Sequence, residues 1–451
     1  MKFKPTPYNF HIWENYAWEI LTEYRQCLEE GLDVEPYKEV FESIAKLPEG
    51  EAKEQFASVI SDLVHDLERV KDYEYNEPSD LEGIRELRNL RLISNTSPTV
   101  SLEKKVEGAW YGRICGCLLG KPVECAWTSS IQEVLKKTNN FPMTRYIKRS
   151  ELKDDMLPEC ERWFFNNTSF ADMIECAPFD DDTNYTVMGQ CLIEDCGINF
   201  TPRDVLEAWI KYQGKNAYCT AERVAYRNYV AGYLPPYTAI VKNPYREWIG
   251  AQIRGDYYGY VTSNPALAAE LAWRDASISH IKNGIYGEML ISAMLACAHN
   301  CEDVLSVIYG GLAQIPSTSR LYKQAMDLIE DYKNGTSQEE AFNKIHTKYD
   351  YKNKHDWCHT ISNALIVIAS LLYGKGDYGK SICMAVETGF DTDCNGATVG
   401  SILGMMYGID AIGNEWTDVI NGTLQTQILG HEKSSVDALV KKTLEHIERY
   451  K

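Results

Sequence analysis

The stretch Gly108-Ala-Trp-Tyr-Gly112-Arg-Ile-Cys-Gly116-Cys-Leu-Leu-Gly120-Lys-Pro122-Val-Glu124 places a glycine at every fourth position and then reaches a Lys-Pro step. At helical spacing the four glycines share one face, where a second helix can approach closely. Each glycine costs a helix about 1 kcal/mol relative to alanine, so four in register indicate a packing requirement. Because helices usually end near a proline, we expect Glu124 to follow the helix terminus and point into a cavity.

Two short acidic clusters lie far apart in the chain: Asp180-Asp181-Asp182-Thr183 and Asp391-Thr392-Asp393-Cys394. Each adjoins apolar or small residues, and buried carboxylates are costly unless they are neutralised. A hard divalent cation prefers oxygen ligands and would neutralise them. The alternative is that both clusters only cap helices, since Asp and Thr are preferred N-cap residues. Their joint occurrence favours a metal site.

Together the three segments resemble the ADP-ribosylglycohydrolase family. The family pattern is a glycine-striped helix ending in Gly-x-Pro-x-Glu, an Asp-Asp-Thr motif, and a late Gly-x-Asp-Thr-Asp motif before a small-residue helix. Gly120–Glu124, Asp181–Thr183 and Gly389–Asp393 match in that order, within a resemblance that covers residues 101–430. The resemblance implies an all-α fold, an orthogonal helical bundle with the metal site between helices.

The resemblance also implies the composition of the site. It predicts two Mg²⁺ or Mn²⁺ ions bound by Asp180, Asp181, Asp182, Asp391 and Asp393. Glu124 and Asp182 are the predicted catalytic residues. Active family members usually carry threonine at the positions of Asp180 and Cys394, and these departures bear on the substrate more than on the metal. Cys394 is a soft ligand that suits magnesium poorly, so we do not include it.

Candidate substrate-binding residues lie between the acidic clusters. Asp275-Ala-Ser277-Ile-Ser-His280 resembles the family's central Asp-Ala-x-x-x-His stretch, and His359 precedes a helix ahead of the late motif. Arg254–Tyr260 combines glycines with tyrosines, which suits a phosphate or a nucleobase but also ordinary packing. The predicted substrate-binding residues are Gly255, Tyr258, Gly259, His280 and His359.

The histidines allow two other interpretations. His355 and His359 are four residues apart and could bind zinc from one helix face, although matching ligands for a closed four-ligand site are missing from the wider sequence. His280 lies near Ser277, so the two could form a Ser-His pair. A hydrogen-bonded core histidine is the more frequent outcome for such a residue.

Apolar periodicity indicates helices throughout, in two parts: an N-terminal helical extension, 1–98, and a catalytic domain, 99–451, with the boundary at the polar loop 95–98. The predicted helices are Ile12–Glu30, Tyr37–Ala45, Ala52–Val70, Arg203–Tyr212, Gly284–Ala298, Ser362–Tyr373 and Ser435–Arg449. Tyr226–Thr262 is rich in proline, glycine and tyrosine and is predicted to be a long loop that lines the site.

Composition restricts the partners. Lys and Arg number 46 against 65 Asp and Glu, a formal charge of −19, and no basic stripe stands out. This argues against nucleic acid, which requires clustered cations. The longest apolar run, Ala364–Tyr373, is too short to span a bilayer, and Met1–Tyr8 lacks the apolar core of a signal peptide. With fourteen cysteines and no export signal, we expect a reducing, cytoplasmic location without disulfides.

The resemblance predicts a metal-dependent hydrolase that cleaves the ribosyl glycosidic bond at C1′ of ADP-ribose or of an ADP-ribosylated substrate, which includes ADP-ribosylated proteins. A ribosyl N-glycosidase that acts on a small nucleoside-like compound is an alternative. Another is a non-catalytic, crystallin-like relative. The retained carboxylates Glu124, Asp181, Asp182, Asp391 and Asp393 favour an enzyme.

Overall fold

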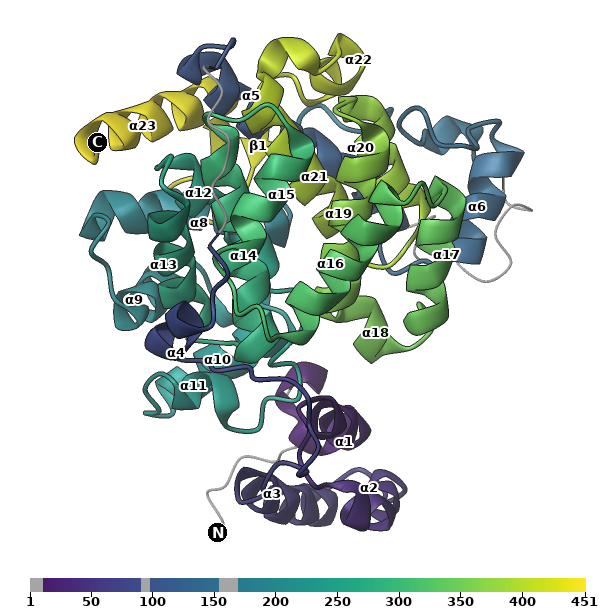
Figure 1. The fold of residues 1–451 in the computed structure, drawn as a ribbon, viewed down its shortest axis with the longest axis vertical. Coiled ribbons are helices and arrows are strands. Elements are labelled where there is room, and N and C mark those ends of the chain that lie inside the picture. The colour runs from purple at the N-terminus through teal and green to yellow at the C-terminus, as the bar shows by residue number, and fades with distance from the viewer. Residues whose placement is uncertain (1–10, 91–97, 154–168) are drawn as a thin grey trace.

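The glycine-striped segment forms helix α5 (Leu102–Gly120), which packs antiparallel against α21 (Thr392–Tyr407) at the centre of the molecule (Figure 1). The computed structural model describes residues 11–90, 98–153 and 169–451. A second stripe on α21 opposes the first, and the facing pairs are Gly108 with Gly404, Gly112 with Gly400 and Gly116 with Gly396. A Cβ added at any of these glycines would overlap the main chain of the opposite helix, so only glycine permits this approach.

Helices dominate the described residues, and the predicted all-α fold is confirmed. Those preceding the acidic cluster at 180–182 are α1 (Ile20–Glu29), α2 (Lys38–Ala45), α3 (Glu51–His65), α4 (Leu81–Glu86), α5 and α6 (Thr128–Lys137). The central ones are α8 (Asp181–Cys196), α9 (Pro202–Tyr212), α10 (Thr220–Val230), α11 (Tyr237–Ile240), α12 (Asp256–Tyr260), α13 (Pro265–Ala276), α14 (Lys282–Ala298) and α15 (Val304–Leu312). The last are α16 (Arg320–Lys333), α17 (Gln338–Lys348), α18 (Lys354–Cys358), α19 (Thr360–Gly374), α20 (Tyr378–Glu387), α21, α22 (Asn414–Thr417) and α23 (Val436–Arg449).

Short elements complete the fold. The strands β1 (Thr423–Gln425) and β2 (Lys433–Ser435) pair antiparallel, with Thr423 opposite Ser435. The 3-10 helices are η2 (Ile12–Glu14), η3 (Tyr16–Glu19), η4 (Glu35–Tyr37), η5 (Lys121–Val123), η6 (Arg149–Glu151), η7 (Lys215–Ala217), η8 (Gln252–Arg254), η9 (Ile409–Ala411) and η10 (Asp418–Ile420).

The core surrounds α14 and α19, whose residues are buried on every face. Such all-round burial explains why the sequence of these helices is apolar throughout rather than amphipathic. The helices expected near residues 203–212, 284–298, 362–373 and 435–449 correspond to α9, α14, α19 and α23. Within the described ranges, no helix has the length and apolarity needed to cross a membrane.

Two sequence-based expectations about secondary structure were wrong. The segment Tyr226–Thr262 is not one long loop, because it contains the end of α10 and all of α11, η8 and α12. Its prolines do not interrupt a helix, since Pro236 lies at the N-cap of α11. The helix expected over Ile12–Glu30 begins only at Ile20, because Asn15 ends η2 and caps η3 through its side chain.

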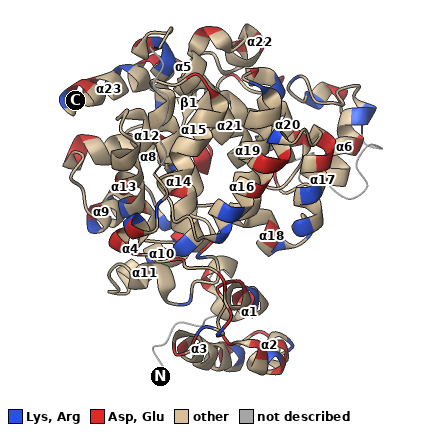
Figure 2. Ribbon diagram, viewed as in Figure 1, with Lys and Arg blue, Asp and Glu red and all other residues tan. Residues whose placement is uncertain are grey.

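The N-terminal helices α1, α2 and α3 lie below the main bundle in Figure 1 and have a small apolar core of their own. That core is built from Tyr16, Ala17, Ile20, Cys27, Val34, Phe41, Ile44, Ala57, Ile60 and Val64. The proposed division near residue 98 stays a prediction, since residues 95–97 and 1–10 lie outside the described part of the chain. Acidic and basic residues are intermixed along the helices in Figure 2.

Candidate active site

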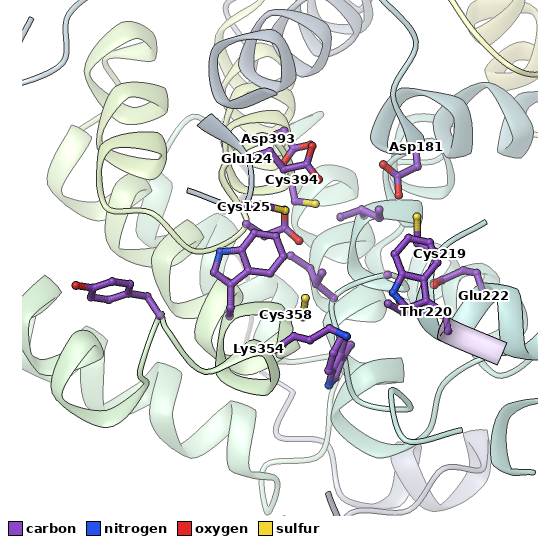
Figure 3. A pocket seen from close by; sticks show the side chains of 18 of the residues that line it. Glu124, Cys125, Asp181, Cys219, Thr220, Glu222, Lys354, Cys358, Asp393 and Cys394 are labelled. Atoms are coloured by element: carbon purple, nitrogen blue, oxygen red, sulfur yellow. The ribbon is translucent and has the colours of Figure 1, made fainter. Parts of the chain in front are cut away.

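The ends of three helical segments meet at the candidate site. Asp180 is the N-cap of α8, Asp391 precedes α21, and Glu124 follows α5 and η5. The Thr392 hydroxyl donates a 2.9 Å hydrogen bond to the Gly120 carbonyl oxygen, which ties the start of α21 to the end of α5. The packing of α5 against α21 therefore brings Glu124 beside the second acidic cluster. In Figure 3, Glu124 and Asp393 lie together, with Asp181 across the cavity.

The capping interpretation holds for one cluster. Asp180 Oδ1 accepts a hydrogen bond of 2.9 Å from the Asp182 amide, so this side chain does cap α8. The Asp391 side chain makes no capping bond within the described structure. Instead the side-chain oxygen of Asn363 accepts a hydrogen bond from the Asp391 amide at 3.1 Å and another from the Asn395 side chain at 2.8 Å. The Asp391 carboxylate is thus free of the helix terminus that it precedes.

Carboxylate oxygens converge between the two clusters. Glu124, Asp180 and Asp393 each have an oxygen within 4.8 Å of the other two, and so do Asp182 and Asp393 with the Cys394 sulfur. Asp182 Oδ2 and Asp393 Oδ1 are buried and have no hydrogen-bond partner among the described residues. Buried unpaired carboxylate oxygens at this spacing fit a bound divalent cation, which supplies the missing interactions.

Two cations of the chain neutralise part of this negative charge. Lys121 forms an ion pair with Asp180. The guanidinium of Arg113 is fully buried, donates to the Asp182 carbonyl oxygen at 2.8 Å and lies 3.1 Å from Asp182 Oδ1. It also pairs with Asp256 at 2.9 Å, so it holds the start of α8 against α12. Sequence reasoning gave neither cation a role, because one lies within a glycine stripe and the other in a Gly-x-Pro motif.

The pKa values of the carboxyl groups reflect burial and crowding. Burial and the neighbouring Asp393 raise the pKa of Glu124 well above its usual range. Burial and Asp180 raise the pKa of Asp393 to about 6. For Asp180, burial alone would raise the pKa, but the Lys121 ammonium outweighs it and the pKa is lowered. The carboxyl groups of the site therefore resist ionisation unless a cation lies close to them.

A cavity of about 350 Å³ opens beside the carboxylates. Its wall includes Glu124 and Asp393 on one side and Asp181 and Glu222, which lies on α10, on the other (Figure 3), and Asp391 also lines it. Its remaining surface is largely aromatic, from Trp13, Trp127, Tyr185, Trp248, Tyr351 and Trp357. The cavity thus combines a few polar, acidic groups with a mainly apolar wall, as small-molecule sites commonly do.

Glu222 is a wall residue that sequence reasoning missed. Its Oε1 accepts a 2.6 Å hydrogen bond from Arg254, whose guanidinium is itself buried. The surrounding sequence, Cys219-Thr-Ala-Glu222, resembles an ordinary helix start and carries no recognisable motif. Only the fold brings this carboxylate to the cavity that Asp181 lines.

The structure does not bring Gly255, Tyr258 and Gly259 to the cavity. Tyr258 is buried and its hydroxyl donates to Asp275 at 2.6 Å. The two glycines allow α12 to pack against α14, because a Cβ at either would meet Ser292. Their spacing therefore serves helix packing. Arg254, in the same stretch, contacts the cavity wall through its hydrogen bond to Glu222.

The two histidines predicted to bind substrate, His280 and His359, do not line the cavity either. His280 is buried, its Nδ1 is 2.8 Å from the Ser279 hydroxyl, and its Nε2 is 3.9 Å from Glu222. It pairs with Ser279 and not with Ser277. His359 caps α19 by accepting a 3.1 Å hydrogen bond from the Ile361 amide, and its Nε2 lies 3.3 Å from Glu29 rather than in the cavity.

The zinc interpretation of His355 and His359 conflicts with their hydrogen bonds. His355 Nδ1 accepts from the Trp248 indole at 3.0 Å, and His359 Nδ1 accepts from the Ile361 amide. Both neutral rings must then carry their proton on Nε2, which faces Glu29 in each case. A protonated nitrogen cannot bind a metal; His355 Nε2 instead forms a 3.2 Å hydrogen bond with Glu29 of the N-terminal segment, and His359 Nε2 lies 3.3 Å from the same carboxylate.

Comparison with known families agrees with this geometry. The family model of ADP-ribosylglycohydrolase matches residues 98–449. The chain belongs to the ADP-ribosylglycohydrolase family. Among solved structures, a chain of an ADP-ribosylglycohydrolase-related protein complex is similar at 15% identity over 77% of this chain and 98% of that chain, with a TM-score of 0.47. No curated protein matches this chain.

Membership of this family supports glycoside hydrolysis as the general reaction class. The matched range contains all three motif segments, Gly120–Glu124, Asp181–Thr183 and Gly389–Asp393, and does not include α1, α2, α3 or α4. The resemblance inferred from these motifs is therefore confirmed. The matched part of the chain carries every carboxylate of the acidic clusters and of the cavity wall.

Proposed function

We propose that this protein is a metal-dependent hydrolase that cleaves the ribosyl glycosidic bond at C1′ of ADP-ribose or of an ADP-ribosylated substrate. The observation that carries the proposal is the convergence of Glu124, Asp180, Asp182 and Asp393 beside an open cavity. Family membership supports the reaction class. A decayed, crystallin-like relative would have no reason to maintain this costly group of buried carboxylates.

Mg²⁺ or Mn²⁺, in two sites, would be held by Asp180, Asp181, Asp182, Asp391 and Asp393, of which Asp181, Asp391 and Asp393 also line the cavity. The unpartnered oxygens Asp182 Oδ2 and Asp393 Oδ1 support this choice. Bound divalent cations supply Lewis acidity and lower the pKa of a coordinated water. Arg113 and Asn363 fix the two helix starts that present these carboxylates, so the ligand set is positioned before any cation binds.

Glu124 is the residue that we assign to proton transfer at the glycosidic bond. It is the one motif carboxylate outside both clusters, and it lines the cavity at the end of α5 and η5. The carboxylates around it favour the positive charge that develops at C1′ as the leaving bond weakens. Ribose would lie between Glu124 and Asp393 on one side and Asp181 on the other.

A ribosyl N-glycosidase that acts on a small nucleoside-like compound is the second candidate. The cavity volume of about 350 Å³ favours it, because this is near the lower end for small-molecule sites. The aromatic wall suits a base as the leaving group as well as it suits the adenine of ADP-ribose. An ADP-ribosylated protein would have to present its modified side chain into the same cavity.

A thermal-shift series with and without Mg²⁺ or Mn²⁺ tests the proposal, using ADP-ribose, ribose nucleosides and nucleotides as ligands. Stabilisation by metal and a further metal-dependent shift with ADP-ribose support the first candidate, whereas a shift with nucleosides alone supports the second. Release of ribose or ADP-ribose from the stabilising compound would then demonstrate turnover. Binding without turnover would indicate the crystallin-like alternative, and no stabilisation by any metal would contradict the proposal.

A further inference from the structure

The N-terminal segment reaches the cavity through one side chain, Trp13. This residue lies on η2 (Ile12–Glu14) and forms part of the cavity wall. It packs against the apolar cluster that contains Trp248 and Cys358, as Trp357 does, and these three residues line the same cavity. The family match begins only at residue 98, so Trp13 is an addition to the matched bundle.

Local contacts hold η2 rigidly against the cavity wall. The buried Glu14 carboxylate accepts a 2.6 Å hydrogen bond from Arg223 and lies 2.8 Å from Lys215. Arg227 donates to the Glu14 carbonyl oxygen at 2.8 Å. Both arginines belong to α10, the helix whose first turn carries the wall residue Glu222. Trp13 is therefore fixed to the same helix as part of the opposite wall.

The rest of the N-terminal segment is docked by complementary charges. Glu30 on α1 accepts from Arg246 at 2.6 Å and pairs with Lys282, and all three side chains are largely buried. Further acidic residues of the segment pair with basic residues or histidines of the bundle: Glu19 with Lys354, Glu23 with Arg246, Glu29 with His355 and His359, and Glu77 with Arg320. Separating the two parts would leave buried cations uncompensated, which is strongly unfavourable.

We propose that Trp13 is a specificity-determining residue: with Trp248 and Trp357 it receives a planar aromatic ring of the substrate while the ribose faces the carboxylates. This inference rests on the proposed function and adds to it the chemical class of the group beside the ribose. Indole faces supply a large apolar contact area, and aromatic pairs gain about 0.5–1.5 kcal/mol beyond burial. The wall also contains Lys352 and Lys354, and Lys354 is paired with Glu19.

The test measures binding in the presence of Mg²⁺ for the full-length protein and three variants. Adenosine and ADP-ribose carry an aromatic ring, and ribose 5-phosphate does not. Trp13→Ala should weaken binding of the two ring-bearing ligands by about 10-fold and leave ribose 5-phosphate unchanged, whereas Trp13→Phe should lose about 3-fold or less. Trp18→Ala is the matched control, because Trp18 lies on the next 3-10 helix, is 51% exposed and should bind all three ligands as the parent does.

Two results would overturn the inference. One is parental affinity of Trp13→Ala for adenosine and ADP-ribose. The other is an equal loss for ribose 5-phosphate, which would mean that the substitution damages the whole site; melting temperatures of the variants identify this case. If the parent itself binds none of the three ligands, the proposed function fails and this inference fails with it.

Discussion

Gly116 on α5 and Gly396 on α21 lie in main-chain contact, and each occupies the space that a Cβ on the other would need. The relationship repeats one and two turns away, at Gly112 with Gly400 and at Gly108 with Gly404, so the α5–α21 pair behaves as a single unit. Its end carries η5 and Glu124 on one side and Asp391 and Asp393 on the other. The distance between the candidate proton-transfer group and the candidate metal ligands is therefore set by glycine.

Gly116→Ala should destabilise the protein by about 3 kcal/mol or prevent folding, because neither main chain can yield to the added methyl group. The control is Gly214→Ala, since a Cβ there has no heavy atom within 4 Å. That variant should remain within about 0.5 kcal/mol of the parent. Thermal or denaturant unfolding measures both, and indistinguishable curves would refute the packing argument.

Asp391→Asn combined with Asp393→Asn should abolish stabilisation by Mg²⁺ or Mn²⁺, because it removes two carboxylates from the candidate metal site. In the parent, metal at about 100 times its dissociation constant should add about 2.7 kcal/mol of stability, and chelation should remove it. Asp410→Asn, at an exposed position paired with Lys104, provides a control for the loss of a carboxylate outside the site. An undiminished metal response in the double variant would contradict the assignment.

Glu124→Gln should retain metal and ribose binding but lower turnover by about 10²-fold or more, since the amide cannot transfer the proton. The measurement is initial rate on a compound that the parent cleaves, together with ligand affinity. Glu133→Gln, at a half-exposed site on α6, is the control and should act like the parent. Nearly normal turnover in Glu124→Gln would leave this residue as a ligand or a positioning group.

Lys121→Met should lower the melting temperature in the presence of a chelator, because Asp180 then loses the cation that neutralises it. Breaking one side of a buried ion pair costs about 3–5 kcal/mol, and the partial exposure of Lys121 places the expected loss below that range. Added Mg²⁺ should restore part of the stability by replacing the lost positive charge. If the variant and the parent melt at the same temperature in the presence of a chelator, Lys121 does not contribute to stability through Asp180.

Motifs of the candidate site could be predicted from the sequence, because each is a short segment with its own spacing. The glycine stripe predicts a helix pair, and the Lys-Pro step correctly places Glu124 after the helix end. The acidic clusters were recognised by their apolar flanks. The binding role expected for Gly255, Tyr258 and Gly259 finds no support in the cavity, because glycine and tyrosine at this spacing serve close helix packing equally well.

The opposite wall could not be predicted, because its residues come from segments with no motif. Glu222 begins an ordinary amphipathic helix, and Trp13 lies in a short turn that the sequence pattern had merged into one long helix. His359 is correctly expected at a helix start, but the direction of its free nitrogen depends on Glu29 of α1. Such long-range contacts leave no local periodicity in the sequence.

Local sequence patterns were sufficient to predict the helical character of the chain, a glycine face that a second helix can approach closely, and the carboxylates of the candidate site. Those features follow from local spacing, because the period of a helix decides which side chains share a face. Only the tertiary structure decided that Lys121 and Arg113 neutralise the acidic clusters and that Trp13 closes the cavity. Ion pairs and cavity walls bring together residues that are far apart in the chain, so local spacing does not reveal them. An unpaired charge becomes strongly unfavourable only once the packed helices have buried it.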